Sequence, residues 1–133
     1  MTIPFQTDLR PALPNVYGAS DYREFRDPLS RMDHLLRYSG VEDGLVSSAL
    51  ERWEKGSRET GVKVMAAQQQ RQRRMFHYGL RCNVARHLSG ESFRAFSIRI
   101  GDSSLIQWFT GISLFEHRKA ASKSSLERYE KYF

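Results

Sequence analysis

Hydrophobic residues recur every three to four positions along much of this 133-residue chain, the spacing that places side chains on one face of an α-helix. A first helix is expected to begin at the Asp27-Pro28 pair and to end near Gly40, because Asp caps helices, Pro favours their first turn and Gly follows their last. Its apolar positions are Leu29, Met32, Leu35 and Leu36. A second helix is expected over residues 42–53, ending at Gly56, with a buried side made of Leu45, Val46, Ala49, Leu50 and Trp53.

A long central helix is predicted over residues 59–88. Its hydrophobic side chains fall within an arc of about 100°, and four arginines fall on the opposite side over roughly 140°. The first set is Val62, Met65, Phe76, Leu80 and Val84, and the second is Arg71, Arg74, Arg81 and Arg86. Arg73 projects toward the apolar side. Gly61 and Gly79 each cost up to about 1 kcal/mol relative to Ala, so a bend or a break is expected near one of them.

Shorter helical segments follow. Phe93, Phe96 and Ile100 form a helical stripe, and Gly101-Asp102 is typical of a turn in which Asp caps the next helix, expected over residues 103–109. That helix carries the hydrophobic residues Leu105, Ile106, Trp108 and Phe109. After a loop, a last helix is expected to begin within residues 122–124, where Ser124 and Glu127 have the spacing of a capping box.

No segment shows the alternation of a β-strand. The pattern therefore predicts an all-α fold of five to six helices, one of them long and central. Residues 20–133 are expected to form a single helical domain, which is an ordinary domain length. Residues 1–19 are expected to form an extended N-terminal arm, because proline blocks regular hydrogen bonding there at Pro4, Pro11 and Pro14.

The charge is unevenly distributed. The chain has a net charge of +6, but residues 1–54 carry 6 Lys/Arg against 9 Asp/Glu, whereas residues 55–133 carry 15 against 6. A basic half of this kind is typical of a protein that binds a polyanion, and charge alone does not choose between DNA, RNA and a membrane surface. The alternative is that the positive charge only aids solubility.

Several classes of protein are disfavoured. Cys82 is the single cysteine, so no disulfide forms within the chain, and the reducing cytoplasm is the expected location. No run approaches the roughly 18 apolar residues of a membrane span, and the first residues lack the pattern of a signal peptide. Neither a zinc-ligand spacing nor a phosphate-binding glycine loop is present, and no nucleophile has a recognisable base. We therefore expect no enzymatic activity, no metal, no cofactor and no small-molecule substrate.

Residues 91–109 have the outline of a helix-turn-helix, in which the second helix enters the major groove of DNA. Two helices joined by a glycine turn are also common in any helical domain. Trp108 and Phe109 are expected in the core rather than stacked on bases, given their apolar neighbours.

Arginine dominates the basic half, and its planar guanidinium can hold phosphate or guanine with paired hydrogen bonds. The alternative is a helix face that is merely solvated. About six phosphate contacts would give a log–log dependence of affinity on salt with a slope of about −5. The candidate DNA-binding residues are Arg71, Arg74, Arg81, Arg86, Arg94, Arg99, Arg118, Lys119, Lys123 and Arg128.

Three motifs in order carry a family resemblance: GESFR at residues 90–94, DSSLIQWFTGI at residues 102–112 and SKSSLERY at residues 122–129. With the residues between them, from Gly79 onward, they resemble the N-terminal domain of bacterial insertion-sequence transposases. Two positions depart from the pattern of that family, which commonly has proline at the position of Ala121 and threonine at that of Ser125.

The resemblance implies a helical module that recognises the terminal inverted repeats of a mobile element in double-stranded DNA. In the family a separate domain with three acidic residues binds a divalent metal and cuts DNA. None of the acidic residues near these motifs matches that triad: Asp102, Glu116, Glu127 and Glu130. The chain is thus expected to hold DNA without cutting it, as a truncated remnant, one frame of a split element or an excised domain.

A second hypothesis is a protein-interaction module. The hydrophobic stripe between Val62 and Val84 would then pack against a second copy and pair transposase subunits, with the basic face incidental. A fragment of this kind would also inhibit a full-length transposase by mixing with it.

Overall fold

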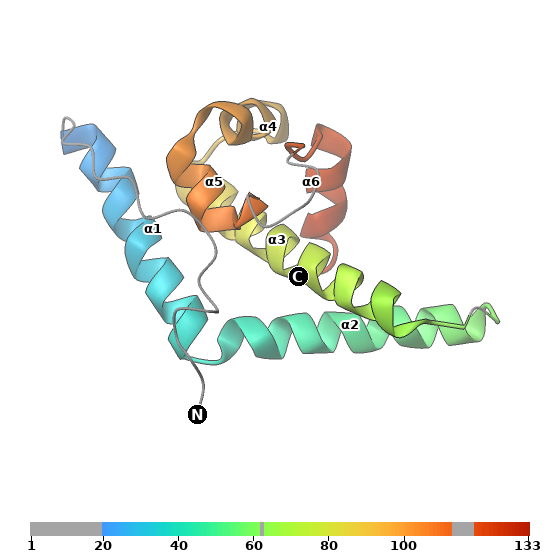
Figure 1. The fold of residues 1–133 in the computed structure, drawn as a ribbon. Coiled ribbons are helices and arrows are strands. Elements are labelled where there is room, and N and C mark those ends of the chain that lie inside the picture. Colours follow the sequence, from blue (N-terminus) through green and yellow to red (C-terminus); the bar gives the residue numbers. More distant parts are fainter. Residues whose placement is uncertain (1–19, 62, 113–118) are drawn as a thin grey trace.

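The computed structural model describes residues 20–61, 63–112 and 119–133, and these residues form six α-helices and no strand (Figure 1). The helices are α1 (Ser20–Tyr38), α2 (Val41–Glu59), α3 (Ala66–Ser89), α4 (Phe93–Asp102), α5 (Ser104–Thr110) and α6 (Lys123–Glu130). The all-α prediction is confirmed. The expected arm of residues 1–19 lies outside the described residues.

The second half of α3 is the centre of the fold. α3 contacts α1, α2, α5 and α6, and in Figure 1 it runs behind α5 and α6 and back along α2. Its buried residues are therefore spread around the helix instead of along one stripe: Phe76, Tyr78, Gly79, Leu80, Arg81, Cys82, Asn83 and Ala85. The first half of α3 extends beyond this core beside the end of α2, and every side chain from Ala66 to Arg71 is exposed.

α1 begins seven residues earlier than the sequence suggested. It starts at Ser20, and Pro28 lies inside it, so the expected start at Asp27 is wrong. Proline in a helix interior removes one backbone hydrogen bond. Tyr22 and Phe25, in the turns before Pro28, pack against the core, and their burial offsets that loss. Leu29 is fully buried, whereas Leu35, expected on the same buried side, is 53% exposed.

The expected helix over residues 59–88 is two elements. α2 continues through Gly56 to Glu59, and the chain turns at Gly61, which has a φ of +79° that favours glycine. α3 then begins after Met65, whose side chain is exposed. The predicted break near Gly61 is confirmed. Leu45 of α2 is 43% exposed, so its predicted burial is wrong.

Gly79 permits close contact between α3 and α6. A Cβ atom at this position would lie 2.9 Å from Cγ of Tyr129 and 3.0 Å from its Cδ1. Asn83, one turn later, donates from Nδ2 to the Tyr129 carbonyl at 3.0 Å. Gly79 thus does not interrupt α3, and its lack of a side chain lets the Tyr129 ring seat against the helix.

The last three helices follow the predicted apolar pattern, but their caps differ. Phe96, Ile100, Trp108 and Phe109 are buried as expected. The serine side chains that cap α5 and α6 are Ser103, which accepts from the Ile106 amide, and Ser122, which accepts from the Ser125 amide. Asp102 and Ser124 are therefore not the caps. No helix in the described part of the chain has the length and apolarity needed to cross a membrane.

Candidate nucleic-acid interface

The α4–α5 pair does not present a recognition helix. Five of the seven residues of α5 are buried: Leu105, Ile106, Trp108, Phe109 and Thr110. The Gln107 side chain is half-buried and donates to the carbonyls of Ile100 and Gly101 at 2.9 and 3.1 Å. A helix enclosed in this way cannot enter a DNA groove, so the helix-turn-helix interpretation of residues 91–109 is wrong.

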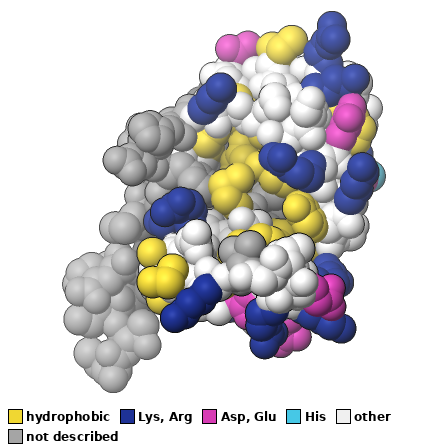
Figure 2. All heavy atoms as spheres, turned by 90° about the vertical axis from the view of Figure 1, so that its right-hand side faces the viewer, with side chains coloured by type: hydrophobic (Ala, Val, Ile, Leu, Met, Phe, Trp, Pro, Cys, Tyr) yellow, Lys and Arg dark blue, Asp and Glu magenta, His cyan; other side chains and the backbone are white. Residues whose placement is uncertain are grey.

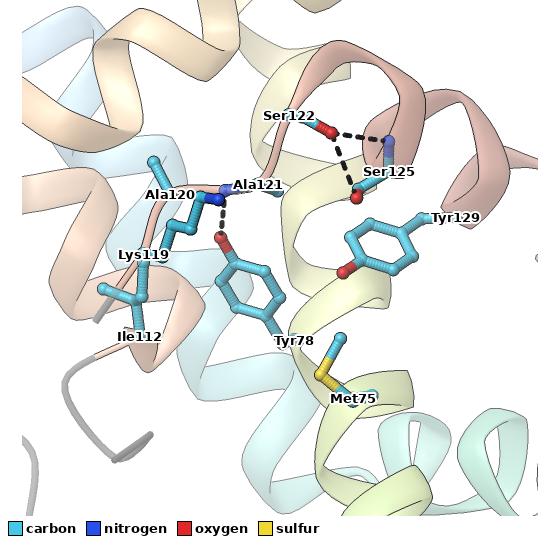
Figure 3. Close-up of a pocket in the computed structure, with 9 residues that line it drawn as sticks. All are labelled: Met75, Tyr78, Ile112, Lys119, Ala120, Ala121, Ser122, Ser125 and Tyr129. Carbon is cyan, nitrogen blue, oxygen red and sulfur yellow. Dashed lines mark hydrogen bonds between the residues drawn. The ribbon is translucent and has the colours of Figure 1, made fainter. Parts of the chain in front are cut away.

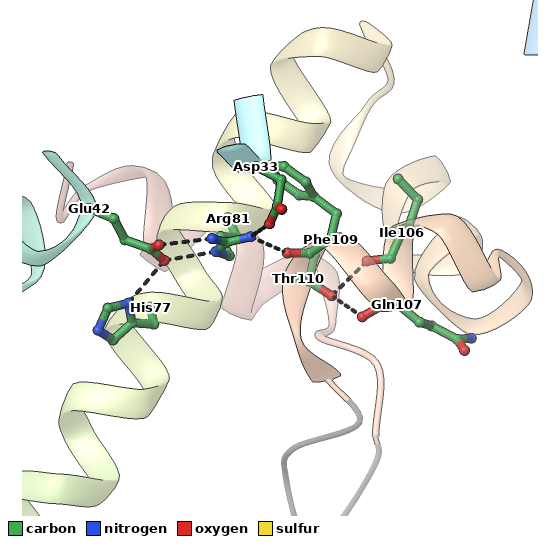
Figure 4. Close-up of polar contacts among 8 residues, drawn as sticks. All are labelled: Asp33, Glu42, His77, Arg81, Ile106, Gln107, Phe109 and Thr110. Atoms are coloured by element: carbon green, nitrogen blue, oxygen red, sulfur yellow. Dashed lines mark hydrogen bonds and ion pairs between the residues drawn. The ribbon is translucent and has the colours of Figure 1, made fainter. Parts of the chain in front are cut away.

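Arg81 is the most buried of the candidate DNA-binding residues (Figure 4). Its Nε and Nη2 donate to the two carboxylate oxygens of Glu42 at 2.8 and 2.9 Å. Its Nη1 donates to Oδ1 of Asp33 at 2.7 Å and to the Phe109 carbonyl at 2.9 Å. Its expected place on an exposed face is wrong, because α1, α2 and α5 cover that side of α3. Arg81 connects four helices and is not available to a ligand at the surface.

Glu42 is held ionised by the same cluster. Burial raises the pKa of its carboxyl group, but hydrogen bonds from His77 and Arg81 outweigh burial and lower that pKa to about 2. The distance between His77 Nδ1 and Glu42 Oε2 is 2.9 Å. Burial also opposes the charge of Arg81, whose pKa is nevertheless raised by its bonds to Glu42 and Asp33. The cluster therefore places one guanidinium between two carboxylates inside the core.

Two further candidate arginines connect helices. Arg86 donates to the Glu91 carbonyl and to Glu130 Oε1, both at 3.2 Å, and lies 4.2 Å above the Phe93 ring. Arg99 pairs with the Glu91 carboxylate and lies 5.3 Å from the centre of the Phe25 ring. The side chain of Arg86 is only 15% exposed, so it offers little to a ligand.

The remaining candidates are exposed. Lys123 pairs with Glu127 of the same helix at 3.3 Å, an exposed pair that contributes little. Arg118 lies outside the described residues. The others make no ion pair with any carboxylate of the described ranges, and they are Arg71, Arg74, Arg94, Lys119 and Arg128. Arg73, which the pattern placed toward the apolar side, is also exposed.

Two hollows lie along α3 on the side of these cations. The first has a volume of about 260 Å³ between α3, α6 and residues 119–122 (Figure 3). It is lined by Met75, Tyr78, Ile112, Lys119, Ala120, Ala121, Ser122, Ser125 and Tyr129. The second, about 250 Å³, lies between α2 and the first half of α3 and is lined by Trp53, Ser57, Val64, Gln68, Arg71, Gln72 and Met75. Met75 lines both hollows, and none of the described residues that line them is acidic.

Figure 2 views the side of the molecule where α6 and the start of α3 lie, and there Lys and Arg side chains surround a hollow with a hydrophobic floor. Arg71, Arg74 and Tyr78 share one side of α3 at helical spacing, and Tyr78 lines the first hollow. Arg128 donates from Nη2 at 3.4 Å to Oγ of Ser125, which lines that hollow. We call the side chains of Arg71, Arg74, Lys119 and Arg128 the basic face.

The family models, curated proteins and solved structures compared with this chain include no match.

The protonatable groups around the first hollow are held in their neutral forms. Burial is the main cause that raises the pKa of Tyr129 to about 12, and burial also raises the pKa of Tyr78 above its ordinary value. The pKa of the Cys82 thiol, buried behind Tyr78, is raised to about 12 for the same reason. The hydroxyl groups are thus hydrogen-bonding groups at neutral pH. In the described ranges no three His, Cys, Asp or Glu side chains are grouped to hold a metal ion.

Apart from Lys119, the sequence analysis did not identify the polar residues that line the first hollow. Tyr78 is separated in the chain by more than 40 residues from Ala121, whose amide donates to its hydroxyl at 3.3 Å. The three motifs of the resemblance do contain Ser122, Ser125 and Tyr129, but they do not indicate that these residues face α3. Only the packing of α6 across Gly79 brings the two sets together.

Proposed function

We propose that this chain binds double-stranded DNA through the basic face. The observation that carries the proposal is that Lys119 lines the first hollow and Arg71 the second, and no carboxylate of the described ranges pairs with any of the four cations. Cations without a carboxylate partner are free to exchange their counterions for phosphate groups, which supplies most of the affinity of non-specific DNA binding. Three of the four are arginines, which suit paired bonds to phosphate.

The first half of α3 is the element we expect to meet the duplex. Residues 66–74 form about 13 Å of helix beyond the core, at about 1.5 Å per residue. An α-helix is about 10–12 Å across, which fits the major groove of about 12 Å. Arg71, Arg74 and Gln70 are exposed there, and Arg and Gln are the side chains that pair with guanine and adenine edges. α3 thereby takes the role first assigned to residues 103–109.

The resemblance to insertion-sequence transposases indicates which DNA this chain would bind. Its three motifs fall at the start of α4, on α5 and on α6. α5 and α6 pack against α3, and α4 packs against both α5 and α6. Within such a transposase this chain would recognise the ends of the element, and cleavage would belong to a separate metal-dependent domain.

The hypothesis of a protein-interaction module depends on the hydrophobic stripe between residues 62 and 84, and two residues of that stripe are buried. Phe76 and Leu80, from the stripe between residues 62 and 84, are buried within the chain against Val46, Ala49 and Leu50 of α2. They are not available to a second copy. Val62 lies outside the described residues.

A salt titration tests the proposed function. Fluorescence anisotropy would compare a duplex carrying the inverted repeat next to the gene with a shuffled duplex of the same composition. Four phosphate contacts predict a log–log slope of affinity against salt between about −3 and −4, with tighter binding to the repeat. Absence of binding at low salt, or binding that salt leaves unchanged, would overturn the proposal.

A further inference from the structure

The hollow between α3, α6 and residues 119–122 has the size of a ring system. Its volume of about 260 Å³ is slightly below the range of drug-sized ligand sites, which begins near about 300 Å³. Figure 3 shows the Tyr78 and Tyr129 rings side by side, with Met75 at one end of the hollow and the two serines at the other. The ring planes are nearly perpendicular at 86°, with centres 6.0 Å apart, so they form a fixed corner.

Its lining pairs apolar walls with neutral hydrogen-bonding groups. Met75, Ile112 and Ala120 supply apolar surface, while Ser125 and Tyr129 supply hydroxyl groups. A nucleobase likewise has apolar faces and an edge of hydrogen-bond donors and acceptors. Proteins recognise unstacked bases through contacts with both.

Two cations belong to the hollow or to its lining residues. Lys119 lines it directly, and Arg128 is bonded to Ser125 at its rim. The Ser125 amide at the start of α6 is already bonded to Ser122, so a phosphate would be held by the two cationic side chains instead of by the helix end.

The hollow also lies next to the surface that we propose to bind DNA. Met75 separates it from the second hollow, which Arg71 lines, and Arg71 precedes Tyr78 by about 10 Å along the helix axis, at about 1.5 Å per residue. A strand held at Arg71 would therefore pass the mouth of the first hollow within a few nucleotides.

We propose that this hollow binds one unstacked nucleotide, with its base against Met75 and Tyr129 and its phosphate between Lys119 and Arg128. This inference rests on the proposed DNA binding, because a strand on the basic face would deliver the nucleotide. The shared chemistry is a nucleoside monophosphate unit, which a strand or a free nucleotide can supply.

The test compares two labelled duplexes of one sequence. One contains 2-aminopurine opposite an abasic position, so that this base is unpaired, and the other is fully paired. We expect the first to bind about tenfold more tightly, as for one well-contacted base, and its 2-aminopurine fluorescence to change on binding. Titration with deoxyadenosine monophosphate alone forms the second arm.

Amino-acid substitutions test whether the preference for the unpaired base arises in this hollow. Ala120→Phe fills the hollow and should abolish the preference for the unpaired base, measured as the ratio of the affinities for the two duplexes. Ala95→Phe, on the exposed side of α4, is the matched control and should keep the preference. Lys119→Gln, at an exposed position, should weaken the preference if Ala120→Phe fails to fold.

The outcomes separate the two proposals. Steep salt dependence without a preference for the unpaired base, and without binding of the free nucleotide, overturns the hollow site and leaves DNA binding standing. If the unmodified chain binds neither duplex, the proposed function is overturned. Binding of the free nucleotide that Ala120→Phe removes supports the site and assigns it to a free ligand, whereas a preference that survives in Ala120→Phe contradicts it.

Discussion

Arg81 and Glu42 face each other through two parallel hydrogen bonds, from Nε to Oε2 and from Nη2 to Oε1, inside the junction of α2 and α3. Paired geometry of this kind fixes direction as well as distance. The pair sets where the first turn of α2 meets the middle of α3, and thereby how far the rest of α2 follows the exposed half of α3.

Removing the guanidinium should therefore destabilise the fold strongly. Arg81→Met would remove the guanidinium that is bonded to both Asp33 and Glu42 in the core, and the expected loss is about 3–5 kcal/mol of unfolding free energy at neutral pH. Urea denaturation followed by circular dichroism measures it. Arg74→Met is the matched control on the same helix and, being exposed, should change stability by no more than about 0.5 kcal/mol. Similar values for the two variants would contradict the burial of Arg81.

Stability should fall in acid through Glu42. Because its pKa is lowered from 4.5 to about 2 on folding, its contribution is complete above pH 4.5 and is lost as the pH falls toward 2. The shift corresponds to about 3 kcal/mol. Unfolding free energies measured across this range should decline less steeply for Glu42→Gln than for the unmodified chain. Glu51→Gln, exposed on the same helix, should retain the full slope, and an unchanged slope in Glu42→Gln would refute the assignment.

Two glycine substitutions should change the free energy of unfolding in opposite directions. Gly79→Ala should cost about 1–3 kcal/mol, because its Cβ would meet the Tyr129 ring at 2.9 Å in a packed interface. Gly56→Ala should stabilise by about 0.5–1 kcal/mol, because it lies inside α2 with no atom within 4 Å of the added Cβ. Denaturation midpoints of the two variants give the comparison. Stabilisation by both would show that α3 and α6 are not in close contact.

Charge removal on α3 should change the salt dependence of DNA binding. The double variant Arg71→Gln, Arg74→Gln removes two proposed phosphate contacts, which should reduce the log–log slope by about 2 and weaken binding at least about tenfold at physiological salt. The double variant Arg23→Gln, Arg31→Gln removes the same charge from exposed positions on α1. Equal effects of the two double variants would mean that net charge, and not the basic face, governs binding.

The sequence predicted the helices better than their ends. The stripes that bury Phe96 and Ile100 were correct because α4 has one buried side, as the helical period assumes. Pro28 misplaced the start of α1 because local propensity favours a helix start there, while the packing of Tyr22 and Phe25 against the core extends the helix past it.

The candidate site was harder to predict for a related reason. A helical wheel divides α3 into an apolar and a basic side, but neighbours on several sides bury both in its second half. Arg81 is therefore part of the core, whereas Arg71, two to three turns earlier on the same helix, is exposed where those neighbours end. Nothing local in the chain marks that difference, because Asp33 and Glu42 are 48 and 39 residues away from Arg81.

The position of α3 also determines the order in which the chain can close. Leu29 of α1 and Val46 of α2 are synthesised before the helix that covers them, and Arg52 Nη2 donates to the Tyr132 carbonyl, 80 residues later. Contacts between residues this far apart in the chain require loop closure, which costs entropy, before they can stabilise the fold. On the ribosome, α1 and α2 therefore emerge before α3 can cover them, and the contacts between α3 and α6 form last.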